Sequence, residues 1–118
     1  MESVNVMSFG KMNQRIEILA PTTITDAEGF QSKELKLVVS VRAYREGRHG
    51  SSAWANRAAF THASDLFRIH KPAASIDETM LIRTTGGELF EIDSVEDVRG
   101  RGRYLEILAS STHAEGSN

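Results

Sequence analysis

Cysteine is absent from the 118-residue chain, and only two prolines and one tryptophan occur. Without cysteine the protein has no disulfide bonds, no thiol nucleophile, no iron–sulfur ligation and no cysteine-based zinc site. No apolar run approaches the length of a signal-peptide core or of a membrane-spanning helix. These absences predict a soluble protein that is made in the cytoplasm and has no membrane partner.

A strong charge of either sign is also missing. Fourteen Lys and Arg against sixteen Asp and Glu leave a net charge of −2, so no global positive field attracts nucleic acid. Hydrophobic residues make up 40% and charged residues 25%, which is ordinary for one globular domain of this length. We expect a folded domain over residues 10–109, a flexible N-terminal arm over 1–9 and a disordered C-terminal tail over 110–118.

Alternating apolar and polar residues predict strands along most of this domain. One long strand carries apolar residues on a single face, with Val38 as the exception on the other: Leu35, Leu37, Val39, Val41 and Ala43. An earlier strand contains Ile16 and Ile18, and we predict that it ends at Pro21, which lacks a backbone donor. Four shorter runs follow, at residues 65–71, 80–84, 88–96 and 104–109.

Turn sequences join these strands in pairs. In residues 25–29, Asp26 can bond its own backbone and Gly29 tolerates a positive φ, and residues 85–87 read Thr-Gly-Gly. Only residues 51–60 lack alternation, and their small residues with Trp54 predict one short α-helix. The predicted fold is mainly β: a small antiparallel β-barrel or sandwich of about six strands, with one short α-helix and a mobile loop. The alternative is a half-open sheet that the helix covers.

No arrangement of residues predicts catalysis. His62 and Asp65 lie close in sequence, but a metal site would need two further ligands that the sequence does not indicate. Glu91 and Asp93 share a face, which fits the solvated side of an amphipathic strand better than a general acid and base. We expect a protein that is not an enzyme, with no catalytic residues, no metal and no other cofactor.

Two segments are candidates for binding. Arg99, Arg101 and Arg103 alternate with glycines in one loop, although Glu96, Asp97 and Glu106 make the local charge 3 − 3 = 0. This loop is a solvated hairpin loop, a protein interface or, last, a nucleic-acid contact. The second segment follows the long strand and is predicted to be mobile before a partner binds. Its candidate residues are Glu46, Arg48, His49, Ser51 and Trp54.

The order of these features resembles a known family. The series runs MNQRIEILAPTT, DAEGFQ, VRAYREG, a helix of small residues, FRIHKP, MLIR, GGELFEIDSVED and RYLEILA. It is similar to the head-tail joining proteins of tailed bacteriophages, also called head-closure, stopper or adaptor proteins, over residues 10–109. Members often carry a longer basic and aromatic stretch where this chain has His70-Lys71-Pro72.

The resemblance implies a structural virion protein. Such a protein forms a ring, expected to be dodecameric, beneath the portal and adaptor (connector) proteins, closes the DNA-filled head and receives the tail-completion or tail-tube protein. Residues 46–63 resemble the family's inserted loop, which faces the channel near the packaged DNA. Assembly would place the protein in the host cytoplasm first and then in the neck of the virion. The alternative is a small OB- or SH3-like barrel that binds nucleic acid through residues 99–103.

Overall fold

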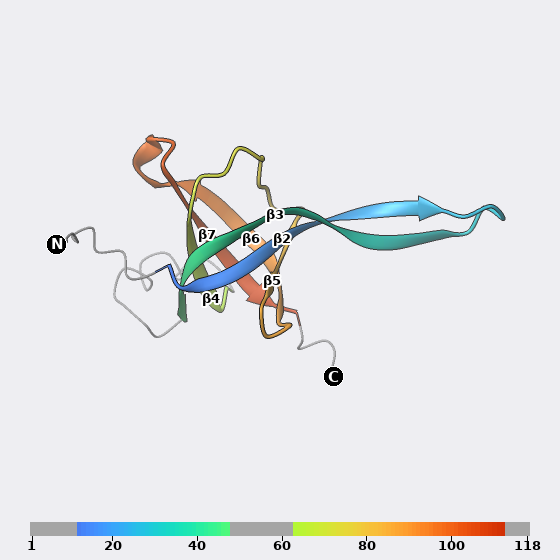
Figure 1. The fold of residues 1–118 in the computed structure, drawn as a ribbon, viewed down its shortest axis with the longest axis horizontal. Coiled ribbons are helices and arrows are strands. Elements are labelled where there is room, and N and C mark those ends of the chain that lie inside the picture. The colour runs from blue at the N-terminus through green and yellow to red at the C-terminus, as the bar shows by residue number, and fades with distance from the viewer. Residues whose placement is uncertain (1–11, 48–62, 113–118) are drawn as a thin grey trace.

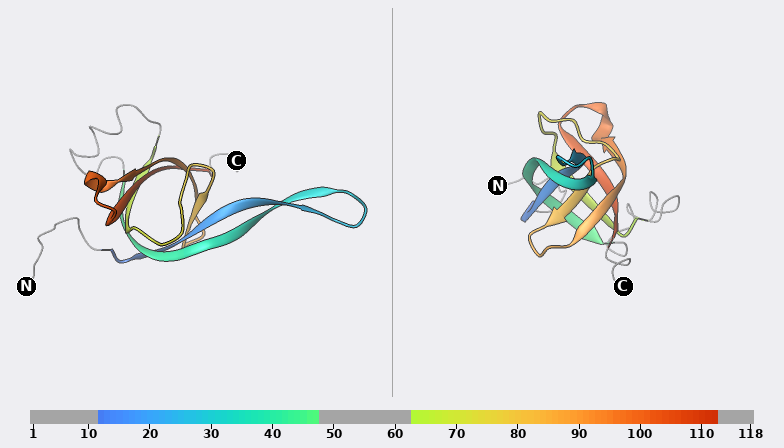
Figure 2. Two further views of the ribbon diagram at one scale, coloured as in Figure 1. Left: turned by 90° about the horizontal axis from the view of Figure 1, so that it is seen from above. Right: turned by 90° about the vertical axis from the view of Figure 1, so that its right-hand side faces the viewer.

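The structure is a computed structural model that describes residues 12–47 and 63–112. Within them, six antiparallel strands close into a barrel in the order β2-β3-β4-β7-β6-β5 (Figures 1 and 2). The strands are β2 (Gln14–Thr25), β3 (Gln31–Gly47), β4 (Asp65–His70), β5 (Leu81–Thr84), β6 (Leu89–Asp97) and β7 (Tyr104–Ser111). The predicted antiparallel barrel is confirmed over the half-open sheet, because β5 pairs back onto β2.

Helix is scarce in the described ranges. The single helical element there is the 3-10 turn η1 (Val98–Gly100), at the start of the connection from β6 to β7. The α-helix predicted at residues 51–60 lies outside the described residues. None of the helical structure described is long and apolar enough to cross a membrane.

Large apolar side chains from all six strands fill the barrel. Phe67 and Phe90 meet edge to face, with ring centroids 5.3 Å apart and planes inclined at 73°. The remaining buried members of this core are Ile16, Ile18, Ala43, Ile69, Ile82, Ile92, Leu105, Ile107 and Ala109. Each large side chain that is buried in this way contributes about 1.5–3 kcal/mol to the stability of the fold.

Strands β2 and β3 continue well beyond the barrel wall. Strand β2 pairs with β5 over residues 16–19, and β3 pairs with β4 over residues 44–47. Residues 20–25 and 31–36 pair with each other. They form a two-stranded projection, here called the hairpin arm (residues 20–37), which extends to the right in Figure 1. The molecule is therefore elongated, with principal extents of 59 × 31 × 26 Å.

Pro21 does not end β2, and the prediction that it would is wrong. Pro21 lies opposite Leu35 within the β2–β3 ladder, at a point where β2 has already separated from β5. A proline is tolerated on such an edge because the open side of the strand requires no backbone donor. Four further positions of the ladder follow, and Thr25 is the last.

Alternating apolar residues continue along β3 beyond the part of the strand that contacts the core. Val39 packs against the core and Ala43 is buried within it, whereas Leu35 is 39% and Leu37 53% exposed. A β-bulge at Val38 shifts the register between these two halves of the strand. Beyond the bulge, Leu35 and Leu37 are exposed on the arm, so the alternation in the sequence continues past the point where the core ends.

The turn at the tip of the arm confirms the predicted hairpin. Oδ1 of Asp26 accepts hydrogen bonds from the backbone N–H groups of Glu28 and Phe30, each at 2.9 Å. Gly29 has a φ of 90°, a value that favours glycine. The second predicted hairpin is confirmed too: β5 pairs with β6, and the N–H of Gly87, with a φ of 92°, donates to the carbonyl of Thr84.

Candidate assembly interfaces

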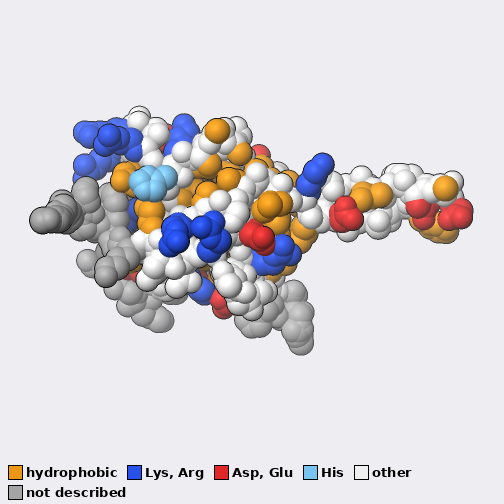
Figure 3. All heavy atoms as spheres, viewed as in Figure 1, with side chains coloured by type: hydrophobic (Ala, Val, Ile, Leu, Met, Phe, Trp, Pro, Cys, Tyr) orange, Lys and Arg blue, Asp and Glu red, His pale blue; other side chains and the backbone are white. Residues whose placement is uncertain are grey.

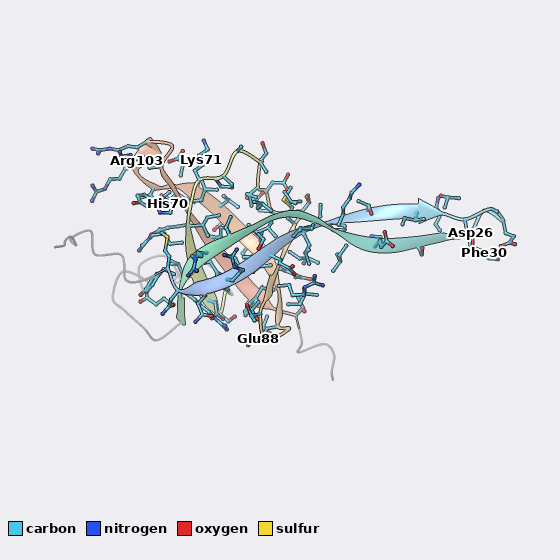
Figure 4. The ribbon with its side chains drawn as sticks, viewed as in Figure 1. Asp26, Phe30, His70, Lys71, Glu88 and Arg103 are labelled. Atoms are coloured by element: carbon cyan, nitrogen blue, oxygen red, sulfur yellow. The ribbon has the colours of Figure 1, made fainter. Side chains whose placement is uncertain are left out.

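The hairpin arm presents an apolar surface to solvent. Every exposed large hydrophobic side chain among the described residues lies on it: Ile24 (41%), Phe30 (71%), Leu35 (39%) and Leu37 (53%). Asp26 lies beside Phe30 at the tip (Figure 4). Glu28, in the same turn, adds a second carboxylate. Clustered exposed apolar side chains mark interaction surfaces, so the arm is a candidate interface. Sequence analysis missed it; the available signal was Phe30, an aromatic residue directly after a polar turn.

A groove lies where the arm leaves the barrel. It has a volume of about 440 Å³, and its apolar lining comes from the arm, the segment before β5 and strand β6. The lining residues are Pro21, Lys33, Leu35, Glu78, Thr79, Met80, Leu81, Glu91 and Ile92. Asp77, nearby in sequence, accepts hydrogen bonds from the hydroxyl and the N–H of Thr79, which lower its pKa. The groove is open and mixed in character, with two carboxylates and one ammonium group.

The β6–β7 connection forms a basic projection at the opposite end of the molecule from the arm tip (Figures 3 and 4). Arg99, Arg101 and Arg103 are all exposed, and the φ of Arg99 is 58°. The backbone of this Arg loop (residues 98–103) is tied down, because the N–H of Lys71 donates to the carbonyl of Arg103 at 2.8 Å. Lys71 adds a fourth exposed positive charge beside the loop.

The local charge balance computed along the sequence does not hold in space. Glu106, one of the three acids in that balance, is 5% exposed and forms an ion pair with Arg68 in the barrel wall. Asp97 accepts a hydrogen bond from the N–H of Gly102 at 2.9 Å and lies 3.7 Å from Nζ of Lys71. In the described part of the chain, no carboxylate pairs with Arg99, Arg101 or Arg103. With Glu106 paired to Arg68, Glu96 and Asp97 remain against Arg99, Arg101, Arg103 and Lys71, so the charge around the Arg loop is 4 − 2 = +2.

Arg45 joins three elements at one end of the barrel. Its Nε lies 2.8 Å from Asp65 in β4, and its Nη1 lies 2.9 Å from Glu88 in the β5–β6 turn. The guanidinium also stands 5.1 Å from the ring centroid of Phe90 and 5.6 Å from that of Phe67. Burial lowers the pKa of Arg45, but the two carboxylates together outweigh burial and raise it. Arg45 is a structural clamp that keeps its charge.

A second polar cluster lies on the outer face of the barrel wall. Arg68 pairs with Glu106 across β4 and β7, and its guanidinium is 5.7 Å from the ring centroid of Tyr44. The hydroxyl of Tyr44 donates to Oε1 of Glu46 at 3.1 Å. Burial of Tyr44, followed by this bond to Glu46, raises the pKa of the tyrosine. The cluster fixes the end of β3, from which residues 48–62 continue.

Glu46 is the one residue of the predicted channel-loop candidates that the structure describes. It is half-buried in β3, where Tyr44 holds it. Arg48, His49, Ser51 and Trp54 lie outside the described residues. The role predicted for this group thus stays a prediction.

The residues weighed for enzyme or metal chemistry occupy structural positions where they are described. Asp65 is engaged by Arg45 and by the hydroxyl of Ser64, and His62 lies outside the described residues. Glu91 and Asp93 are exposed on β6, and Oδ2 of Asp93 accepts a hydrogen bond from Ser110 at 2.6 Å. In residues 12–47 and 63–112, no three His, Asp or Glu side chains are placed to hold a metal ion.

Comparison with known proteins decides the family. Residues 7–112, nearly the whole chain, match the sequence profile of a family described as phage head completion protein. The chain belongs to the phage head completion protein family. This head completion protein is accordingly a structural protein of the virion, as the resemblance implied.

Two solved structures share the fold of the head completion protein. The solution structure of a protein from Shigella flexneri 2a is 19% identical, with a TM-score of 0.70, and the match covers 95% of this chain and 99% of that one. A chain in the virion of a native gene transfer agent particle is 17% identical, with a TM-score of 0.52, over 85% of this chain and 94% of that one. No curated protein matches the sequence. At these identities the two structures show the fold alone.

Proposed function

We propose that this head completion protein forms a ring, dodecameric in number, in the neck of the virion. The ring docks beneath the portal and adaptor proteins, closes the DNA-filled head and provides the attachment site for the tail-completion or tail-tube protein. The family match over residues 7–112 carries the proposal. The neighbouring fold in a gene transfer agent virion supports it, because that chain was solved within an assembled particle.

The chemistry of the described surfaces suits an assembly protein rather than an enzyme. The barrel buries its ionisable groups in ion pairs such as Arg68 with Glu106, which hold the wall together. The exposed features are the apolar hairpin arm and the basic Arg loop, and both are built for contact with another macromolecule. In this proposal the protein acts by binding other macromolecules and reaches the neck from the host cytoplasm during assembly.

The segment from residue 46 to 63 supplies the channel-facing loop in this proposal. Glu46 and Gly47 end β3 at the barrel wall, where they pair with Leu66 and Asp65 of β4. Arg48, His49, Ser51 and Trp54 then lie near the packaged DNA in the ring. A variant with Arg48→Ser and His49→Ser is expected to add to heads normally but to retain less DNA. Normal DNA retention by this variant excludes a channel role for the two residues.

The test of the main proposal uses tailless, DNA-filled heads that carry portal and adaptor. Full-length protein is added, the heads are imaged by negative stain, and leaked DNA is measured as nuclease-sensitive nucleic acid. We expect a new ring of density at the portal vertex and a fall in leakage. Heads that stay bare and continue to leak at saturating protein refute the proposal.

Nucleic-acid binding through the Arg loop is the second candidate function. The observation in its favour is the set of exposed guanidinium groups of Arg99, Arg101 and Arg103, which no described carboxylate neutralises. Binding of a single-stranded oligonucleotide, with an affinity that falls steeply as salt increases, would support this function. If a variant with Arg101→Glu and Arg103→Glu still binds the oligonucleotide as tightly, the Arg loop is not the nucleic-acid-binding site.

A further inference from the structure

The two ends of the molecule carry opposite charge. At the arm tip, Asp26 and Glu28 flank the turn, and Phe30 is 71% exposed beside them. At the far end of the barrel, the Arg loop presents three exposed guanidinium groups, and Lys71 lies beside it in an ion pair with Asp97. Figure 4 places Asp26 and Phe30 at one extreme of the molecule and Arg103, Lys71 and His70 at the other. The two surfaces cannot meet within one chain, but they can meet between copies.

The turn at the tip is rigid enough to act as a recognition element. Oδ1 of Asp26 accepts hydrogen bonds from the N–H groups of Glu28 and Phe30, and the N–H of Asp26 donates to the carbonyl of Phe30 at 2.9 Å. These bonds hold the backbone around Phe30 in one conformation, so little backbone entropy is lost when the tip docks. The Arg loop is likewise anchored, by Asp97 and by the backbone of Lys71.

Other surfaces of a second copy suit the tip less well. The groove at the root of the arm contains Glu78 and Glu91 against a single Lys33, so its charge repels an acidic tip. A symmetric contact between two tips would bring four carboxylates together. The Arg loop has three exposed guanidinium groups that no described carboxylate pairs with, and their donors fit carboxylates in a fork geometry. Arg15 and Arg42, which lie opposite each other on β2 and β3, form a smaller exposed basic pair with two guanidinium groups. Guanidinium groups also stack on an aromatic ring, which gives Phe30 a partner in the same place.

We propose that the arm tip of one copy docks on the Arg loop of the next copy in the neck ring. Glu28 and Asp26 face Arg101 and Arg103 of the neighbour, and Phe30 lies against their guanidinium groups. The contact is heterologous, so each copy uses its tip on one side and its loop on the other. This inference rests on the ring proposed above and names the surfaces that join its subunits.

A contact of this kind is weak for one pair of copies. Its charges are exposed, and salt screens them. A closed ring makes the contact once per subunit and holds every subunit between two neighbours, which raises the effective concentration of each surface. The protein would then remain dissociated in dilute solution and join when the portal vertex gathers its copies.

Cysteine cross-linking tests the contact directly, because the chain contains no cysteine of its own. Two full-length variants, Glu28→Cys and Arg101→Cys, are mixed in equal amounts under mild oxidation, both in concentrated solution and on DNA-filled heads. Tip-to-loop docking predicts a disulfide between the two different variants, and little of either symmetric product. Both substitutions lie on exposed turns, so the barrel is expected to remain folded. Symmetric Glu28→Cys dimers as the main product, or no cross-link in either setting, overturn the inference.

Charge reversal supplies an independent test on heads. Glu28→Arg and Arg101→Glu are each expected to weaken ring formation roughly tenfold or more, because each places like charges in the contact. The double variant restores opposite charges between copies and should recover most of the binding. Equal loss in the double variant overturns the proposed pairing. Arg83→Glu, on the barrel wall, is the control for a general effect of charge.

The two proposals fail in different ways. If wild-type protein adds to heads and closes them but no tip-to-loop disulfide forms, the neck function stands and this inference falls. If heads remain bare while the mixed disulfide forms in concentrated solution, the contact is real and the neck function falls.

Discussion

The hairpin arm is a continuation of β2 and β3, two of the six strands of the barrel, but the residues of these strands are buried differently in the two regions. Within the barrel, β2 has β3 on one side and β5 on the other, and its side chains Ile16 and Ile18 are buried. In the arm, β2 has β3 alone, and Ile24 is 41% exposed. In the barrel the apolar side chains are buried and stabilise the fold, whereas in the arm they are exposed to solvent. A protein whose role is assembly gains from this division, because its contact surface can change without unfolding the domain.

The largest expected difference between the two regions is that between their phenylalanines. Phe67→Ala removes a ring from the centre of the core and is expected to cost about 3–5 kcal/mol of unfolding free energy. Phe30→Ala on the exposed tip is expected to change it by about 0.5 kcal/mol or less. Urea unfolding of both variants measures these values. Equal losses would show that the arm and the barrel unfold as one packed unit.

The next prediction compares the stability contributed by a buried ion pair with that contributed by an exposed one. Arg68→Met leaves Glu106 buried without its cation and is expected to cost about 3 kcal/mol. The matched control is Arg83→Met, which removes the partner of Glu17 in a pair that is about 40% exposed on both sides. Its expected cost is about 0.2–1 kcal/mol. The midpoints of denaturant unfolding decide between these values, and a larger loss for Arg83→Met contradicts the comparison.

A smaller effect belongs to the turn at the arm tip. Asp26→Ala removes the acceptor for two backbone N–H groups and is expected to loosen the turn by about 1 kcal/mol. Hydrogen exchange at the amides of Glu28 and Phe30 should accelerate, while the barrel amides keep their protection. Faster exchange throughout the barrel would show that the turn supports the whole fold.

The smallest effect is a pH dependence from the outer face of the barrel. The pKa of Tyr44 is raised from about 10 by burial and then by its hydrogen bond to Glu46, so the folded state holds the phenolic proton more tightly than the unfolded state. The resulting stability is complete below pH 10 and is lost as the pH rises through the folded pKa. Thermal melts across this range should fall less for Tyr44→Phe than for wild type. Identical slopes would exclude the contribution of Tyr44.

Local chemistry in the sequence was enough to predict that the strands form, where both tight turns lie and which residues of the barrel strands face the core. Gly29 and Gly87 occupy positive φ where the turn sequences required it, and Phe90 and Ile92 face the interior as their alternation indicated. The family resemblance predicted the role in the phage particle. The strands and turns can be predicted from sequence because they depend on residues that are near neighbours along the chain.

Long-range packing decided the rest. Whether Leu35 and Leu37 are buried depends on where β4 and β5 stop pairing with β3 and β2, and alternation carries no record of that point. The charge of the Arg loop depends on Glu106 turning into the wall toward Arg68, which lies 38 residues away in sequence. The sequence alone therefore predicted a mainly β fold, a barrel or a sandwich, that resembles the head-tail joining proteins. Tertiary structure decided that the barrel closes, and it produced the projecting arm and the two charged ends. The physical reason is that burial and ion pairing depend on distances in space, which are set only when the barrel closes.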